Sequence, residues 1–378
     1  MTASEWLKRI ASGDETLRVT YGCGAGSLQD SLKLWQDTIH RFLDRFGDRE
    51  VRLFRSPGRI NLRGMHVDTH GGFLNLMTHQ RETVVVASLS GASRTTAVNA
   101  DPAFPDTAFS VKELGDCPEF SARWDSYIMS PRVRARVGRS VGSWGNYVEG
   151  CALNVLHRRR EKGVPDLVLA VGSNLPRGAA LSSSAALCTG LVLAFSSWAD
   201  TQLSPEELIL AARDAEWYAG SRCGVSDQAA MVLGQPNQCI NIALHADRLD
   251  LSTGRAYALS DEVCVLVVNS QTERSLSGKQ LIDYTRNRFV YSMALNVCRQ
   301  ELAALGIDAT RVQAIEDLPA LAPSTLDARD GLRLLYRLLR SIPETVDLAF
   351  LRERYRFPDL DTLYLRHFGN VPEEQRPD

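Results

Sequence analysis

The chain has 378 residues, more than one compact core usually holds, so we expect two domains. Apolar residues make up 44% and charged residues 23%, a globular balance that excludes a disordered or fibrous protein. With 43 Lys and Arg against 45 Asp and Glu, the net charge is −2. This balance argues against a protein built chiefly to hold nucleic acid or an anionic membrane surface.

Targeting signals and cysteine pairs are also missing from the sequence. The sequence contains no run of about 18 apolar residues, so it predicts no membrane span. The first ten residues lack the pattern of a secretory signal. The eight cysteines form no CxxC pair, so neither a zinc site nor a disulfide framework is expected. We therefore expect a cytoplasmic protein with reduced thiols.

The first predicted elements precede residue 90. Residues 28–46 carry apolar side chains at helical spacing, and Ser27 is expected to cap the start of that helix. Residues 51–56 alternate as a strand, which residues 57–58, Pro and Gly, are expected to break into a loop. Residues 82–89 are rich enough in valine for a buried strand.

The middle of the chain alternates between irregular and regular patterns. Residues 98–131 contain four prolines and are expected to be surface connections, followed by the arginine-rich residues 132–139 as a solvated strand face. Residues 166–172 predict a strand that leads through small residues into an Ala- and Leu-rich helix. Residues 204–207 have the capping-box form and predict a helix to about Gly220.

The C-terminal third predicts a strand over residues 262–269, a long helix over 279–302 and further helix over 330–355. Strands and helices mix along the chain without strict alternation of β and α. We therefore expect an α+β fold rather than a doubly wound sheet.

A small-residue loop at 173–187, SNLPRGAALSSSAAL, joins the end of a predicted strand to the start of a helix. Free backbone N–H groups and the positive end of the helix dipole can together bind phosphate there, and the serine hydroxyls can add hydrogen bonds or a ligand to Mg²⁺. The loop is no Walker A motif, because Gly-Lys-Ser/Thr is absent. Plain helix capping is the alternative interpretation.

Two further segments gather polar residues. Residues 56–72 place Arg59, His66, Asp68 and His70 on a glycine-rich stretch after a strand, where such side chains usually contact ligands. An ordinary charged surface loop is the alternative.

Glu216 and Asp227 lie in AEWYAGSRCGVSDQ, residues 215–228. These two carboxylates are either a magnesium ligand and a base, or solvated charges.

These segments together resemble one family. Residues 59–72 are similar to the galactokinase signature GRxNLxGEHxDxxGG, 176–187 to PxGxGLSSSAAL, and 216–228 to the AEHxFxGxxCGxxDQ segment. Residues 144–150 match W-x-N-Y-x-x-G, and Tyr284 precedes a basic cluster as in that family. Order and spacing agree from about residue 50 to about residue 300, so the sequence resembles galactokinases of the GHMP superfamily.

The resemblance implies a two-domain GHMP kinase fold. Residues 1–238 would form the N-terminal domain, with an N-terminal extension and a left-handed βαβ phosphate-binding unit. Residues 239–378 would form an α+β C-terminal domain, with the active site between the two. The family's glycine-rich third motif is not found, so an incomplete second domain is expected, either abbreviated or continued in a longer polypeptide.

The resemblance also implies an enzyme that uses ATP and Mg²⁺ to phosphorylate the anomeric hydroxyl of a galactose-like sugar. Asp227 would accept the hydroxyl proton, and Arg59 would offset charge on the transition state. Ser184 and Glu216 would hold Mg²⁺. The ATP-binding positions would be Pro176, Gly178, Ala179, Ala180, Leu181, Ser182, Ser183 and Ser184. The sugar-contacting positions would be Met65, His66, Asp68, Gly224 and Tyr284.

Two substitutions depart from the family pattern: Ala180 replaces a loop glycine, and Met65 replaces a glutamate that binds the sugar. Because a thioether is a weak hydrogen-bond acceptor, we expect a sugar without a C6 hydroxyl, such as a pentose or a 6-deoxy sugar. The alternatives are a catalytically impaired sensor of sugar and ATP, and a mevalonate-pathway kinase, which the polar residues around Asp68 disfavour. Sugar and ATP are the expected partners, with no nucleic acid or membrane, and a monomer is the default.

Overall fold

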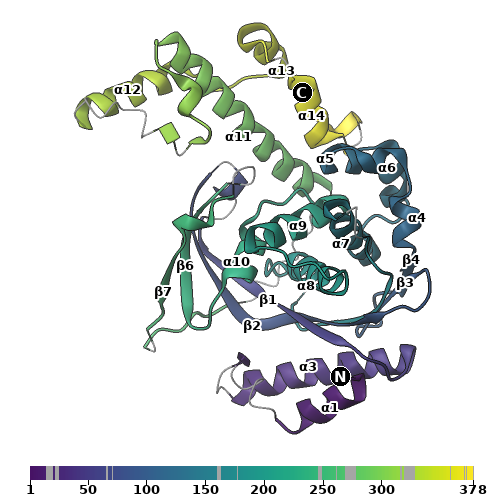
Figure 1. The fold of residues 1–378 in the computed structure, drawn as a ribbon. Coiled ribbons are helices and arrows are strands. Elements are labelled where there is room, and N and C mark those ends of the chain that lie inside the picture. The colour runs from purple at the N-terminus through teal and green to yellow at the C-terminus, as the bar shows by residue number, and fades with distance from the viewer. Residues whose placement is uncertain are drawn as a thin grey trace. The chain divides into compact units, whose positions relative to one another are not determined.

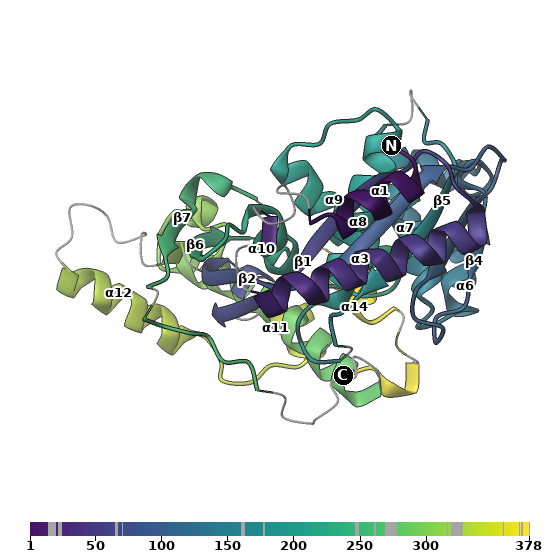
Figure 2. The same cartoon turned by 90° about the horizontal axis from the view of Figure 1, so that it is seen from below.

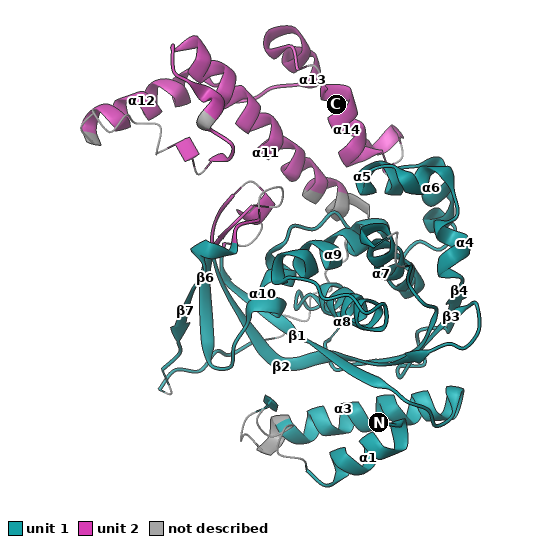
Figure 3. Ribbon diagram, in the orientation of Figure 1, with its two compact units in different colours: residues 1–63, 74–242, 251–274 teal, residues 64–73, 243–250, 275–378 magenta. Residues whose placement is uncertain are grey.

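The structure is a computed structural model (Figure 1). It describes residues 1–13, 20–21, 25–64, 67–69, 71–159, 163–176, 178–245, 249–260, 262–268, 278–315, 317–318, 328–357, 359–369, 371 and 373–377. The chain divides into two compact units (Figure 3). Unit 1 consists of residues 1–63, 74–242 and 251–274, and unit 2 of residues 64–73, 243–250 and 275–378. The domain division expected from the sequence, 1–238 and 239–378, stays a prediction.

Unit 1 is built on a mixed sheet. Within the described residues the sheet has seven strands in the order β4-β3-β5-β2-β6-β7, with β1 also paired to β2. The strands are β1 (Arg52–Arg63), β2 (Gly72–Leu89), β3 (Thr95–Asn99), β4 (Thr107–Phe109), β5 (Leu167–Ser173), β6 (Gln238–Leu244) and β7 (Arg255–Ala258). The pair β3–β5 is parallel, whereas β1–β2, β2–β5, β3–β4 and β6–β7 are antiparallel. This mixture of sheet and helices confirms the α+β class.

Helices cover both faces of this sheet (Figure 1). On one face lie α1 (Ala3–Ala11) and α3 (Ala25–Phe46), which Figure 2 shows in front of the strands. The helices of the other face are α7 (Trp144–Arg158), α8 (Ser183–Trp198), α9 (Pro205–Tyr218) and α10 (Ser226–Leu233). The remaining short helical segments of unit 1 are α4 (Val111–Gly115), η2 (Pro118–Ser121), α5 (Trp124–Ile128), α6 (Pro131–Gly138) and η3 (Leu251–Thr253).

The alternation of side chains along β2 explains the two-sided packing. Val84 and Val86 are fully buried in the core beneath α3, whereas Val85 and Ala87 are fully buried in the core beneath α8. Successive residues of a strand face opposite sides of the sheet, and each fully buried valine contributes about 1.5–3 kcal/mol. On β5, a Cβ at Gly172 would lie 2.0 Å from Thr38 Oγ1, so the glycine lets α3 approach the sheet.

Several predicted elements are confirmed. The helix expected over 28–46 is α3, which begins at Ala25 rather than after a cap at Ser27. The capping box at 204–207 opens α9, with the Ser204 hydroxyl accepting from the Glu207 N–H at 3.2 Å. The strand expected at 82–89 lies within β2, and the strand expected at 166–172 is β5, which begins and ends one residue later. The helix expected over 279–302 lies within α11 (Gly278–Ala304).

The expected break at Pro57 and Gly58 is wrong. Strand β1 runs on to Arg63, because a register shift between Pro57 and Arg59 absorbs the irregularity while the pairing with β2 continues. A Cβ at Gly58 would lie 2.4 Å from His79 Nε2, so the glycine allows this close contact. As a result, Arg59 is a strand residue and not a loop residue.

The interpretation of residues 98–139 also needs correction. The stretch contains β4 and short helices whose aromatic side chains, such as Trp124 and Tyr127, are buried against α7 and α9. The arginine-rich stretch forms α6 rather than a strand, and Arg136 makes two hydrogen bonds, of 2.7 and 2.6 Å, to Glu149 on α7. The aromatic residues stabilise regular structure despite the prolines, one of which, Pro131, occupies the first turn of α6.

Unit 2 is mainly helical in its described residues. Its elements are η1 (Val67–Thr69), α11, η4 (Ala309–Arg311), α12 (Ala328–Ser341), α13 (Leu348–Phe350), the π-helical turn η6 (Leu351–Tyr355), α14 (Leu360–Phe368) and η7 (Glu373–Gln375). The helix expected over 330–355 is therefore interrupted: α12 ends just before Pro343, which cannot continue a helix.

The prediction of a strand over 262–269 is wrong for residues 262–268, which form neither strand nor helix. Residue 269 lies outside the described residues. Leu266 is 83% exposed and Val268 74% exposed. A strand requires a paired neighbour, and within the described residues this segment has none. No helix in the described part of the chain is long and apolar enough to cross a membrane.

Candidate active site

A largely buried ion pair joins strand β1 to helix α10. Arg59 Nε donates to Asp227 Oδ1 at 2.7 Å, and the side chains are 11% and 22% exposed. Arg59 Nη1 donates to the carbonyl of Ala180 at 2.7 Å. One guanidinium thus contacts both the carboxylate that begins α10 and the loop that precedes α8.

The loop before α8 has a distinctive backbone. Gly178, Ala180 and Ser182 have φ angles of 63°, 57° and 57°, in the left-handed region. Left-handed residues that alternate with others form concave groups of N–H donors, which bind anions. Ser182 precedes α8 without capping it; its hydroxyl donates to Asp227 Oδ2 instead.

Ala180 is strained at its φ of 57°, because a Cβ in this region costs roughly 1–2 kcal/mol. Glycine avoids that cost. The substitution noted in the sequence therefore falls where the backbone favours glycine.

The second carboxylate, Glu216 on α9, is 2% exposed. Its Oε2 accepts from Gln228 Nε2 at 2.5 Å and from the Cys223 thiol at 3.3 Å. The Ser184 hydroxyl, in the first turn of α8, is close enough to this carboxylate to lower its pKa. Among the described residues, no Lys, Arg or His forms an ion pair with Glu216.

Burial raises the pKa of Glu216 to about 7, and the nearby charge of Asp227 adds to the rise. The Ser184 hydroxyl, the hydrogen bond from Cys223 and the charge of Arg59 act in the opposite direction. A buried carboxylate without an ion-pair partner is costly unless a cation compensates it.

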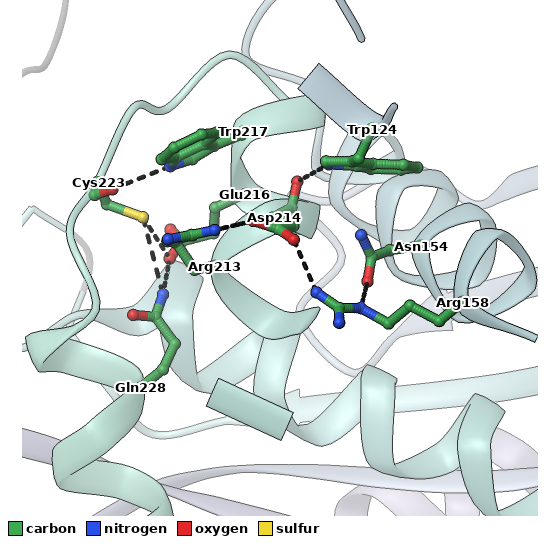
Figure 4. A network of polar contacts seen from close by, with 9 residues as sticks. All are labelled: Trp124, Asn154, Arg158, Arg213, Asp214, Glu216, Trp217, Cys223 and Gln228. Carbon is green, nitrogen blue, oxygen red and sulfur yellow. Dashed lines mark hydrogen bonds and ion pairs between the residues drawn. The ribbon is translucent and has the colours of Figure 1, made fainter. Parts of the chain in front are cut away.

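Figure 4 shows how helix α9 is held in place. Asp214, two residues before the buried glutamate, accepts from Arg158 at 2.8 Å and from Arg213 at 2.6 Å. Arg158 also donates to Asn154 Oδ1 at 2.8 Å, and Trp124 Nε1 donates to the Asp214 carbonyl at 3.0 Å. These contacts fix α9 against α7 and α5, and with it the position of the glutamate.

His79 lies beside the ion pair and was not singled out as a site residue in the sequence. Its Nδ1 accepts from the Arg81 N–H at 3.1 Å, and its Nε2 is buried without a partner among the described residues. Burial and the charges of Arg81 and Arg59 lower the pKa of His79 to about 4. The ring is therefore neutral near pH 7.

The remaining predicted site residues lie in unit 1, in unit 2 or outside the described residues. Gly224 lies in the turn before α10. Asp68, on η1, is 2% exposed and belongs to unit 2, as does Tyr284 on α11. Met65, His66 and His70 lie outside the described residues, as does the side chain of Tyr284.

A magnesium site is compatible with these residues. Within the described residues no three His, Cys, Asp or Glu side chains gather to hold a metal alone. Mg²⁺ commonly takes one or two carboxylates and completes its shell with water and substrate phosphates. Glu216 and Ser184 provide such oxygen ligands at the N-terminus of α8.

Two family models and a curated relative match parts of this chain. Residues 146–235 match the family model for the GHMP kinases N terminal domain, and residues 40–89 match the galactokinase galactose-binding signature. A galactokinase from Roseiflexus sp. (strain RS-1) is 31% identical over 239 residues, which cover 63% of this chain and 53% of that protein. The chain thus spans about half the length of this curated relative.

A solved structure shares the fold. The Lactococcus lactis galactokinase, crystallised with galactose, aligns with a TM-score of 0.53 over 89% of this chain and 79% of that one. The two sequences are 19% identical, so this likeness concerns the fold alone.

Proposed function

We propose that this chain, a galactokinase-like member of the GHMP kinase superfamily, transfers the γ-phosphate of ATP to the anomeric hydroxyl of a monosaccharide. The observation that carries the proposal is the contact of Arg59 with both Asp227 and the loop before α8. It gathers a base, a cation and an anion-binding backbone at one place in unit 1. Its expected location is the cytoplasm.

In this mechanism the N-terminus of α8 binds the ATP phosphates through free backbone N–H groups and the helix dipole. Asp227 accepts the proton of the attacking hydroxyl, and Arg59 offsets the charge on the transferring phosphoryl group. Because phosphoryl transfer depends mainly on positioning and charge stabilisation, no P-loop lysine is required.

Glu216 and Ser184 would hold the magnesium ion, which supplies charge neutralisation for the phosphates when bound. The buried carboxylate fits this role because no protein cation pairs with it within the described residues. The proposed cofactors are therefore ATP and Mg²⁺.

For the substrate we propose a sugar without a C6 hydroxyl, such as arabinose or fucose. The proposal rests on Met65, since leaving that hydroxyl buried without a partner costs roughly 1–3 kcal/mol, or about 5- to 150-fold in affinity. Asp68 and His66 would form hydrogen bonds with the hydroxyls of the sugar ring.

The test measures ATP consumption with galactose, arabinose, fucose and other free sugars. The expected result is Mg²⁺-dependent turnover with arabinose or fucose ahead of galactose. Met65→Glu should move the preference toward galactose, and Met65→Leu, which stays apolar, should not. Preference for galactose would contradict the substrate assignment alone. Binding of sugar and ATP without turnover would favour the sensor.

A further inference from the structure

Two neighbouring residues at the start of α10 have different partners, a guanidinium for the first and a carboxylate for the second. Asp227 pairs with Arg59. Gln228, the next residue, is 0% exposed, and its side chain meets Glu216 on α9 (Figure 4). Consecutive helix residues lie about 100° apart around the axis, so one turn of α10 serves both halves of the site.

The orientation of the Gln228 amide follows from its neighbours. When Glu216 is ionised, as a magnesium ligand is, the atom 2.5 Å from its Oε2 is the NH₂ nitrogen, because an ionised carboxylate only accepts. The amide oxygen is then buried, and the described residues offer it no partner. An unsatisfied buried acceptor costs about 1–3 kcal/mol. Packing alone does not require that cost, since an apolar side chain of similar volume would avoid it.

Cys223 supplies a weaker donor to the same oxygen. Its thiol lies 3.3 Å from Glu216 Oε2, and Gln228 Nε2 lies 3.7 Å from the sulfur. The Cys223 carbonyl accepts from Trp217 Nε1 at 2.9 Å, which fixes the turn before α10. Both donors use Oε2 and neither uses Oε1.

We propose that Gln228 is a positioning residue for the magnesium ligand, with Cys223 as its auxiliary. Its amide fixes the Glu216 carboxylate through Oε2, so that the carboxylate keeps one orientation toward Ser184 and the start of α8. This inference rests on the proposed function, because it takes Glu216 as the ligand. Groups that orient a metal ligand typically change metal affinity or activity by about 10–100-fold when they are replaced.

The test compares wild type with Gln228→Leu, which keeps the side-chain volume and removes the donor. ATP binding is titrated with Mg²⁺ and, separately, measured in EDTA without metal. The expected result is a rise of about 10-fold or more in the Mg²⁺ concentration for half-maximal binding, with metal-free ATP affinity unchanged. Gln300→Leu is the matched control, because that amide donates at 2.7 Å to the Tyr355 carbonyl in unit 2. It should leave both values unchanged.

A second pair of variants covers the case in which Gln228→Leu does not fold. Cys223→Ala should raise the Mg²⁺ requirement several-fold, and Cys223→Ser, which keeps a donor, should restore it to within about twofold of wild type. An unchanged Mg²⁺ titration in folded Gln228→Leu, or in Cys223→Ala where Gln228→Leu fails, overturns the inference and leaves the proposed function intact. If ATP binding by the wild-type protein does not depend on Mg²⁺, both this inference and the proposed function are overturned.

Discussion

The two carboxylates of the candidate site, Asp227 and Glu216, differ in how their charges are compensated. Asp227 is partly exposed and pairs with Arg59 at 2.7 Å. Glu216 is buried, accepts only from neutral donors among the residues that the structure describes, and has a pKa raised to about 7 by burial. Environments that separate two acids in this way usually assign them different roles. Arg59 compensates the first charge, whereas within the described residues no cation pairs with the second.

Asp227→Asn should have the largest effect. The amide keeps the shape and removes both the proton acceptor and the charge opposite Arg59, so kcat should fall by about 10²–10⁴-fold. ATP affinity should change little. Turnover and ATP binding are measured on the same preparation.

Asp106→Asn is the matched control, because Asp106 pairs with Arg41 at 2.9 Å on the protein surface. It should leave kcat unchanged. Near-normal turnover in Asp227→Asn would show that Asp227 is not the catalytic base.

Glu216→Gln should raise the Mg²⁺ concentration for half-maximal turnover by about 10–100-fold, because a neutral amide is a poorer ligand for a hard cation. Sugar affinity should be unaffected. Stability should not fall, since the change removes a buried charge with no ion pair among the described residues.

Glu149→Gln should show the reverse pattern. Glu149 is also buried but pairs with Arg136 at 2.6 Å, so unfolding free energy should fall by about 1–3 kcal/mol with the Mg²⁺ dependence unchanged. If Glu216→Gln and Glu149→Gln changed the unfolding free energy and the Mg²⁺ dependence equally, the proposed difference between the two carboxylates would be wrong.

His79→Asn tests the effect of a histidine whose pKa is lowered mainly by burial and further by the charges of Arg81 and Arg59. The pKa of His79 is lowered to about 4, whereas an unfolded histidine titrates near 6.5. Between these values the unfolded chain binds more protons, so stability falls as pH drops from about 6.5 to 4. His79→Asn should recover about 1–2 kcal/mol of that loss, less than the full shift implies because the ring is partly exposed.

Unfolding curves at several pH values between 4 and 7 provide the measurement. The exposed His40 provides the control, and His40→Asn should lose stability toward low pH as wild type does. An acid profile of His79→Asn that coincides with wild type would argue against this origin of the acid sensitivity.

Ala180→Gly should have the smallest effect. Release from a φ of 57° recovers roughly 1–2 kcal/mol, but the glycine adds about 0.5–1 kcal/mol of chain entropy. The net change should therefore be a gain in stability of about 0–1.5 kcal/mol. Ala179→Gly relieves no positive φ and should lose about 0.5–1 kcal/mol. Equal urea midpoints for the two variants would mean that the backbone at Ala180 is not strained.

Local signals in the sequence were sufficient for much of the fold. Helical spacing predicted α3, the Ser204 capping box predicted α9, and valine-rich runs predicted β2 and β5. These elements form where neighbouring residues agree on one conformation. The family resemblance was carried by short motifs in the same way, and the matches at 40–89 and 146–235 confirm it.

Long-range contacts decided the rest. The passage of β1 through Pro57 and Gly58 depends on pairing with β2, and the helices within 98–139 depend on aromatic side chains that pack against α7 and α9. Residues 262–268 carry a strand-like sequence, but the described residues offer no pairing partner. Strand pairing and burial depend on residues far apart in the sequence, so they cannot be predicted from a single segment.

For the candidate site, the sequence by itself determined which chemical groups are available: two carboxylates, an arginine and a small-residue loop. Only the tertiary structure decided their partners. Arg59 is 168 positions from Asp227 and 121 from the Ala180 carbonyl that it also binds. The difference between the two carboxylates arises from burial and from which donors reach each one, and both follow from how β1, α8, α9 and α10 pack.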